Sequence, residues 1–145
     1  MRIFAKHRTR PGSVFIAPHN DDETLFGAFT LLRERPHVVV CLRSMVQELR
    51  GCGITYRQRE RETAAAMRTL GVPSWEQWEI PDSEPDWALL EDRLRSLDAA
   101  RVFAPAVETG GHEHHNAIAA IAERAFGGRL TAYLTYTEAA RSSRG

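Results

Sequence analysis

The sequence predicts an α/β domain built on one doubly wound, mostly parallel sheet of five strands, with the order 3-2-1-4-5 and helices on both faces. Three observations lead to this prediction. Short apolar runs alternate with amphipathic segments along the chain, which is typical of parallel sheets with right-handed crossovers. The length, 145 residues, is that of one domain. The content of 43% hydrophobic and 26% charged residues is ordinary for a globular protein.

Five short apolar runs predict the strands. Most are rich in β-branched or aromatic residues, and the uninterrupted ones indicate strands that are buried on both faces. The predicted strands are residues 14–17, 38–42, 75–80, 102–104 and 130–135.

Apolar residues recur at helical spacing in four segments between these strands. The apolar stripes are Leu25, Phe26, Phe29 and Leu32; Ala64, Met67 and Leu70; Trp87, Leu90, Leu94 and Leu97; and Ile118, Ile121, Ala122 and Ala125. Gly71 and Gly127 are placed to end the second and fourth helices, and Asp86 is placed to cap the third. Residues 44–55, which include two glycines, are expected to form a loop.

In this strand order the first and fourth strands are neighbours, and the order reverses between them. Such sheets bind ligands at that switch point, beyond the carboxyl ends of the strands. One polar cluster follows the first strand at residues 18–23, and another follows the fourth strand at residues 112–115. The predicted fold therefore brings two clusters together that are far apart in the chain.

The first cluster reads P-H-N-D-D-E, where a strand passes into a helix. Helix capping alone would explain Asp21 and Asp22, because aspartates at a helix start accept backbone N–H bonds and complement the helix dipole. Capping does not require His19, however, and two adjacent carboxylates repel each other unless a cation neutralises one of them. The cluster therefore favours a divalent-metal site in which one aspartate binds the metal and its neighbour acts as a base.

The second cluster follows two glycines and holds three histidines within four residues. His112 and His115 are three residues apart and would face the same way on a first helical turn. A polar helix start with solvated histidines is the alternative reading, and Glu113 fits it as a first-turn carboxylate. A catalytic zinc site uses about three protein ligands and leaves a position for water, and the two clusters together offer enough donors for such a site.

These motifs resemble those of the LmbE-like, or PIG-L, family of zinc-dependent N-deacetylases. The family has P/A-H-P-D-D-E after the first strand and G-H-P-D-H after the fourth, where this chain has P-H-N-D-D-E and G-H-E-H-H. The segments Arg59-x-x-Glu62, Leu70-Gly71-Val72 and Pro81-Asp82 are also similar, so the resemblance covers about residues 13–135.

The resemblance implies a Rossmann-like hydrolase that removes an acetyl or other acyl group from an N-acylated amino sugar or a related small molecule. It implies His19, Asp22 and His115 as ligands of Zn²⁺, although Fe²⁺ or another divalent cation also suits such donors. It implies Asp21 as the general base that activates water, and His112 as the group that polarises the amide carbonyl. The implied substrate residues are Arg59, Asp82 and His114, although an ion pair with Glu62 is an equal alternative for Arg59.

The chain departs from the family pattern at two positions. Asn20 stands where a proline is common, within a turn. His114 stands where the family has an aspartate that resembles the orienting partner of the active-site histidine. This second change leaves the control of the His112 tautomer open, with Glu113 as a candidate replacement.

Three other functions are weighed against deacetylation. A non-catalytic descendant that binds metal or an acylated sugar is favoured by the change at His114 and by the short chain. An iron oxygenase would use the same two-histidine, one-carboxylate ligand set, but the extra Asp21 and the α/β pattern argue against it. A nucleotide-binding module is the weakest alternative, because no G-x-G-x-x-G follows the first strand.

Charge, apolar stretches and cysteine content restrict the kinds of partner and the cellular location that we expect. The formal net charge is zero, whereas a general nucleic-acid binder shows a basic excess. No apolar stretch reaches the ~20 residues of a membrane span, and the first residues lack the apolar core of a secretory signal. Two cysteines make no disulfide framework, so we expect a cytoplasmic protein.

The expected organisation is an N-terminal arm over residues 1–12, one domain over residues 13–137 and a C-terminal tail over residues 138–145. The arm is marked by a local basic bias at Arg2, Lys6, Arg8 and Arg10. The expected partner is a small N-acylated molecule, and a homo-oligomer is compatible with the sequence.

Overall fold

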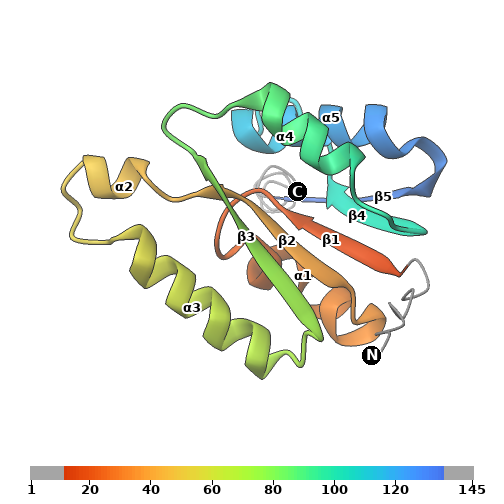
Figure 1. The fold of residues 1–145 in the computed structure, drawn as a ribbon, viewed down its shortest axis with the longest axis horizontal. Helices are drawn as coiled ribbons and strands as arrows, with labels where there is room; N and C mark the ends of the chain where they lie inside the picture. Colours follow the sequence, from red (N-terminus) through yellow and green to blue (C-terminus); the bar gives the residue numbers. More distant parts are fainter. Residues whose placement is uncertain (1–11, 136–145) are drawn as a thin grey trace, which may run out of the picture.

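A computed structural model describes residues 12–135, and its sheet has the strand order β3-β2-β1-β4-β5 (Figure 1). All four strand pairs are parallel, so the predicted fold class is confirmed and the sheet is parallel throughout. The strands are β1 (Ser13–Ala17), β2 (His37–Arg43), β3 (Ser74–Pro81), β4 (Arg101–Pro105) and β5 (Leu130–Tyr133). The predicted arm, apart from residue 12, and the predicted tail lie outside the described residues.

The helices are α1 (Asp22–Glu34), α2 (Val46–Leu49), α3 (Tyr56–Thr69), α4 (Trp87–Arg95) and α5 (Glu113–Phe126), followed by a short 3-10 helix η1 (Gly127–Arg129). The predicted cap of α4 is confirmed, because the Asp86 side chain accepts a hydrogen bond from the backbone N–H of Leu89. The expected loop over residues 44–55 was only partly right, since it contains α2. A helix of four residues is too short to show a period of 3.6 residues in the sequence.

The helices cover both faces of the sheet, as predicted (Figure 1). Successive residues of β1 point to opposite faces, so Ile16 packs with the core under α4 and α5, while Phe15 packs with the core under α1 and α3. Leu90 and Ile118 belong to the first of these cores and Met67 to the second. Burial on both faces explains why the central strands read as continuous apolar runs.

Helix α1 is present as predicted, but the prediction of its apolar stripe was wrong. Leu25, Phe29 and Leu32 are 60%, 89% and 53% exposed, whereas Gly27 and Leu31 are buried. The helix is rotated because Gly27, which has no side chain, lies directly against the ring of Phe15 and lets the helix approach the sheet closely. This rotation also turns the polar first turn of α1 toward the protein interior.

We expect Gly27→Ala to destabilise the fold. Inside a helix alanine is ordinarily favoured over glycine by about 1 kcal/mol. Here an added Cβ would lie 2.7 Å from Cε2 of Phe15 and against its Cζ, and Phe15 is itself stacked on Tyr133 with ring centroids 4.8 Å apart. Overpacking of this kind costs about 1–3 kcal/mol, so the free energy of unfolding should fall by that amount in a denaturant titration.

Gly128→Ala is the matched control for this prediction. A Cβ at Gly128 meets no atom within 4 Å, and no positive φ is recorded there. An equal loss of stability in both variants would contradict the packing argument.

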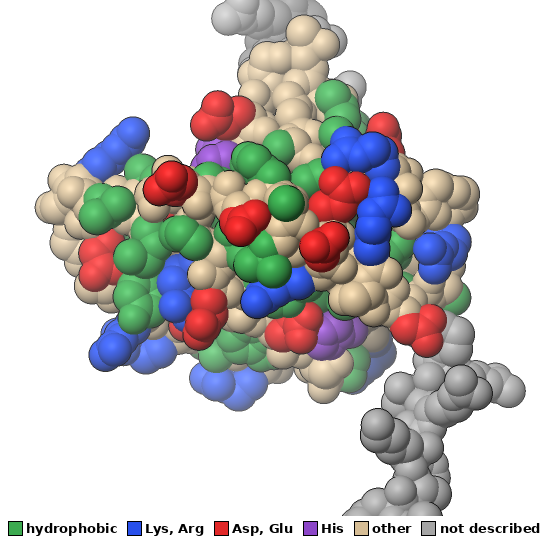
Figure 2. Space-filling model, turned by 45° about the horizontal axis from the view of Figure 1, so that its top comes forward, with side chains coloured by type: hydrophobic (Ala, Val, Ile, Leu, Met, Phe, Trp, Pro, Cys, Tyr) green, Lys and Arg blue, Asp and Glu red, His purple; other side chains and the backbone are tan. Residues whose placement is uncertain are grey.

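The surface agrees with the neutral composition. On the face shown in Figure 2, acidic and basic side chains are interspersed and do not gather in a large patch of one sign. No helix among the described residues is long and apolar enough to span a membrane.

Candidate metal centre

A cavity of about 950 Å³ opens where β1 and β4 end, at the predicted switch point of the sheet. Both polar clusters line it: His19, Asp21 and Asp22 from the turn before α1, and His112 to His115 from the start of α5. Arg59 and Asp82 line it as well. The fold thus brings all eight predicted site residues to one cavity, which is at the large end for small-molecule sites.

The turn between β1 and α1 holds Asp21 in an unusual backbone conformation. Asp21 is the N-cap of α1, and its φ of 84° is in the left-handed region, which aspartate and asparagine tolerate better than most residues. The amide of Asn20 anchors the turn by donating to Thr63 Oγ1 and Gln77 Oε1, both at 2.8 Å. Strained residues of this kind persist only where the surrounding structure fixes them, so the turn is built to present Asp21 to the cavity.

The three predicted metal ligands lie close together. Asp22 Oδ2 lies 3.4 Å from His19 Nδ1 and 3.1 Å from His115 Nε2, and the three residues offer ligand atoms within 4.8 Å of one another. Zinc bonds of 2.0–2.2 Å in a tetrahedron place neighbouring ligand atoms about 3.3 Å apart. The two measured separations match that edge, so His19, Asp22 and His115 fit a divalent cation.

The protonation states of the acidic residues also suit a cation. Burial raises the pKa of Asp22, but hydrogen bonds from His115 and His19 outweigh it and lower the pKa to about 2. Burial raises the pKa of neighbouring Glu23 to about 7, and the charges of Asp21 and Asp22 add to this rise. Asp22 is therefore a permanent anion, while Glu23 stays protonated below neutral pH and does not add a full second charge beside it.

His115 is held by its Nε2 contacts. The residue is 2% exposed, and its Nδ1 is buried without a hydrogen-bond partner among the described residues. Only the contact between Nε2 and Asp22 therefore fixes the ring by hydrogen bonding. A cation bound between these two groups would replace this hydrogen bond, and the ring proton of His115 would then be on Nδ1.

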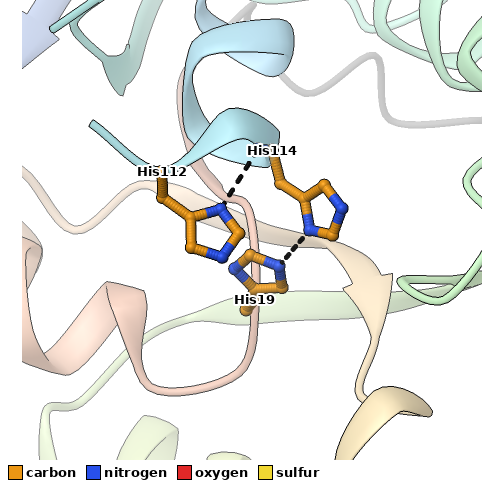
Figure 3. A group of neighbouring side chains, drawn as sticks. All are labelled: His19, His112 and His114. Carbon is orange, nitrogen blue, oxygen red and sulfur yellow. Dashed lines mark hydrogen bonds between the residues drawn. The ribbon is translucent and has the colours of Figure 1, made fainter. Parts of the chain in front are cut away.

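A second set of donors, His19, His112 and His114, also lies close enough for a cation (Figure 3). However, His112 is the N-cap of α5, and its Nδ1 accepts a hydrogen bond from the backbone N–H of His114 at 3.1 Å. The neutral ring must then carry its proton on Nε2, the nitrogen that faces His19 in Figure 3. A protonated nitrogen cannot bind a metal, so the set with Asp22 is the better cation site.

The same cap settles the tautomer of His112, which the sequence left open. Desolvation at the cavity lowers the pKa of His112, and the charges that His19 and His115 would carry add to this effect. A second proton on Nδ1 would also collide with the backbone N–H that this atom accepts. His112 is thus a neutral hydrogen-bond donor through Nε2, and neither an aspartate at position 114 nor Glu113 is needed to make it one.

Arg59 lies against the predicted base and not only along the cavity wall. Its Nη1 forms an ion pair with Asp21 Oδ2 at 2.5 Å and a longer one with Glu62 at 3.4 Å, which was the predicted alternative. Gln47 of α2 accepts from two further nitrogens of the guanidinium, each at 3.2 Å. Arg59 therefore holds the Asp21 carboxylate in place, and contact between Arg59 and substrate stays a prediction.

The two other predicted substrate residues have structural partners. Asp82 Oδ1 accepts from the backbone N–H groups of Met45 and Val46 at 2.7 and 2.9 Å and so fixes the start of α2. His114 Nδ1 lies 2.9 Å from His19 Nε2. Burial lowers the pKa of His114, with smaller contributions from His19 and His112.

Sequence reasoning missed several residues of the cavity, and two of them, Gln47 and Trp87, contact predicted site residues. Gln47 was assigned to a loop, and nothing in the sequence links it to Arg59. Trp87 was assigned to the apolar stripe of its helix, yet it lines the cavity with its ring 5.8 Å from that of His114. Its position directly after the cap, as the first residue of the helix, is the signal that could have separated it from the more deeply buried core residues.

The fold and the site together define a doubly wound α/β protein with a candidate divalent-metal centre at its switch point. The model of the PIG-L family, described as GlcNAc-PI de-N-acetylase, matches residues 14–126. The chain therefore belongs to the PIG-L family. No curated protein matches the sequence.

Several solved structures are similar to this chain, and two of them are as follows. The conserved protein TT1542 from Thermus thermophilus has a TM-score of 0.67 and 26% identity, over 87% of this chain and 67% of its own. GalB, the 4-carboxy-2-hydroxymuconate hydratase from Pseudomonas putida, has a TM-score of 0.62 and 18% identity, over 80% of this chain and 55% of its own. Since a hydratase has a similar fold, the fold alone does not define the reaction. The reaction has to be inferred from the residues of the site.

Proposed function

We propose that this protein is a metal-dependent amide hydrolase that removes an acetyl or other acyl group from an N-acylated amino sugar or a related small molecule. One observation supports this most strongly: three ligand atoms within 4.8 Å of one another, two of whose separations match a tetrahedral edge, lie beside a separate carboxylate, Asp21, in an open cavity. Membership of the PIG-L family agrees with the proposal. Zinc is the proposed metal.

His19, Asp22 and His115 would hold the cation. When bound, it would supply an activated water and a Lewis acid for the acyl oxygen. With two histidines and one carboxylate as its ligands, a zinc ion would keep a position for water, as in catalytic zinc sites.

Asp21 is the proposed general base. It lies in the turn between His19 and Asp22 but does not share the ligand contacts of Asp22, and its side chain is 41% exposed and lines the cavity. Arg59 fixes one carboxylate oxygen, Oδ2, which leaves Oδ1 to take a proton from the attacking water. The same carboxyl can return that proton to the amine nitrogen as the C–N bond breaks. His112 is not the proposed acid, because its one ring proton, on Nε2, is the one that donates to the acyl oxygen.

His112 is the proposed donor to the developing oxyanion. Its Nε2–H is fixed by the helix cap, so the donor needs no reorganisation when negative charge appears on the acyl oxygen. Groups placed in this way act most strongly where water is partly excluded.

We expect His112→Ala to lower kcat by roughly 10²- to 10³-fold, which is the usual effect of removing one oxyanion donor. Metal content should stay unchanged, because His112 is not among the three ligands with Asp22. Steady-state kinetics together with elemental analysis of the purified variant would measure both. Loss of metal in this variant would show that the donor set was assigned wrongly.

The proposal itself is tested by elemental analysis of protein purified without added metal, together with an acetate-release screen over N-acetylated amino sugars. Stoichiometric metal and acetate release from at least one sugar are expected. Metal binding with no acyl release from any amide would instead support a non-catalytic binding protein.

A further inference from the structure

Residue 114 is the clearest departure of this chain from the family motif, and its side chain contacts the candidate centre directly. Its Nδ1 lies 2.9 Å from Nε2 of His19 (Figure 3). The opposite nitrogen of His19, Nδ1, is the one that faces Asp22. His114 and the cation site thus lie on opposite sides of one imidazole ring.

This arrangement fixes the protons of both rings once a cation is bound. A cation on His19 Nδ1 uses the lone pair of that atom, so the ring proton must be on Nε2. That Nε2–H can only donate, and His114 Nδ1 is the atom within hydrogen-bond distance. The remaining proton of a neutral His114 is then on its Nε2, which lies 3.7 Å from Glu113 Oε1.

We propose that His114 is a positioning residue for the metal centre, accepting the Nε2–H of His19 and thereby aiming the other nitrogen of that ring at the cation shared with Asp22 and His115. The inference rests on the proposed metal site. Outer partners of metal-binding histidines are usually carboxylates or carbonyls, and they raise affinity by fixing the tautomer and ring orientation. Here a neutral histidine does so, without adding a negative charge beside Asp22.

The surroundings of His114 support this role. The side chain is only 12% exposed, and its ring is close to those of His19 and Trp87, with centroid distances of 5.1 and 5.8 Å. Its position on the first turn of α5 is fixed through the backbone by the cap from His112. The acceptor is therefore held rigidly, as a positioning residue requires.

The test compares three replacements of His114 by metal affinity, measured in competition with a chromogenic chelator. Asparagine carries Oδ1 on Cγ, where histidine carries Nδ1, so His114→Asn keeps an acceptor at the same place. Glutamine places its oxygen one bond further, and phenylalanine keeps the ring but has no acceptor. We expect His114→Phe and His114→Gln to bind metal 10- to 100-fold more weakly and His114→Asn to bind within about threefold of the wild type.

Glu113→Ala is the matched control. It changes the neighbouring residue on the same helical turn, whose side chain is 89% exposed, and should leave the affinity unchanged. Nitrogen-correlated NMR of the zinc-loaded protein adds a direct readout, since a slowly exchanging Nε2–H of His19 should be present in the wild type and absent in His114→Phe.

Wild-type affinity in His114→Phe would overturn the inference, because the ring alone would then suffice. Two bound cations in the wild type and one in His114→Phe would also overturn it, because His114 would then be a ligand. Normal metal binding by the wild type with no acyl release would defeat the proposed function and leave this inference standing.

Discussion

Replacing Asp21 by asparagine should lower kcat by roughly 10²- to 10⁴-fold, the usual contribution of a general base. The amide cannot take a proton from water, but it has nearly the shape of the carboxylate. Asparagine also tolerates the left-handed conformation that Asp21 adopts, with φ of 84°, so the turn should keep its geometry. Metal content should stay at the wild-type level, since Asp22 and not Asp21 contacts the two histidines.

The ion pair with Arg59 needs its own control, because Asp21→Asn weakens it as well. Glu62→Gln removes the other, longer ion pair of Arg59 at 3.4 Å and leaves Asp21 intact. We expect this variant to lose less than threefold in kcat, since Gln47 and Asp21 still hold the guanidinium. Activity of Asp21→Asn close to that of the wild type would remove Asp21 from the mechanism.

The sheet order and the meeting of the two polar clusters in one cavity were predictable because the strands are under strong chemical constraints, whereas the candidate ligand set was implied by the family resemblance. Strands buried on both faces must be apolar throughout, and alternation with helices then restricts the topology to very few arrangements. Within that topology, the ends of β1 and β4 had to meet. His19 and His115 were therefore brought together by the fold prediction before their chemistry was considered.

Contacts that depend on how helices sit on the sheet could not be predicted. The rotation of α1 follows from the close approach of Gly27 to Phe15, which the spacing of apolar residues does not reveal. The pair between Arg59 and Asp21 likewise depends on the distance between α3 and the turn after β1. Helix α2, which supplies Gln47, is too short to leave a periodic signal.

Position 114 shows how a motif can mislead about the role of a substituted residue. The aspartate of the family motif suggested that a histidine here would leave His112 without control of its tautomer. The structure gives that control to the backbone N–H of residue 114, which any residue but proline would supply. The side chain is thereby free to contact His19 instead, which is the basis of the positioning role inferred for it.

Replacing His115 by alanine should abolish stoichiometric metal binding and, with it, measurable activity. His115 is one of three ligands, and its Nε2 lies 3.1 Å from Asp22, so two donors alone would remain. The loss of metal affinity should exceed the 10- to 100-fold loss that is expected when an outer partner such as His114 is replaced. Elemental analysis after gel filtration measures it directly, and full metal content in His115→Ala would refute the ligand assignment.

Thermal unfolding distinguishes metal loss from misfolding in this variant. Zinc at about 100 times its dissociation constant stabilises a folded protein by about 2.7 kcal/mol, which raises Tm by roughly 5–10 °C for a chain of this length. The wild type should show this rise and lose it with a chelator, whereas His115→Ala should show the same Tm with and without zinc. His37→Ala is the matched control, because His37 begins β2 at the opposite end of the strands and bonds to Ser74. A zinc-dependent Tm in His37→Ala and a zinc-independent, cooperative transition in His115→Ala would together show that His115 acts as a ligand and not as a core residue.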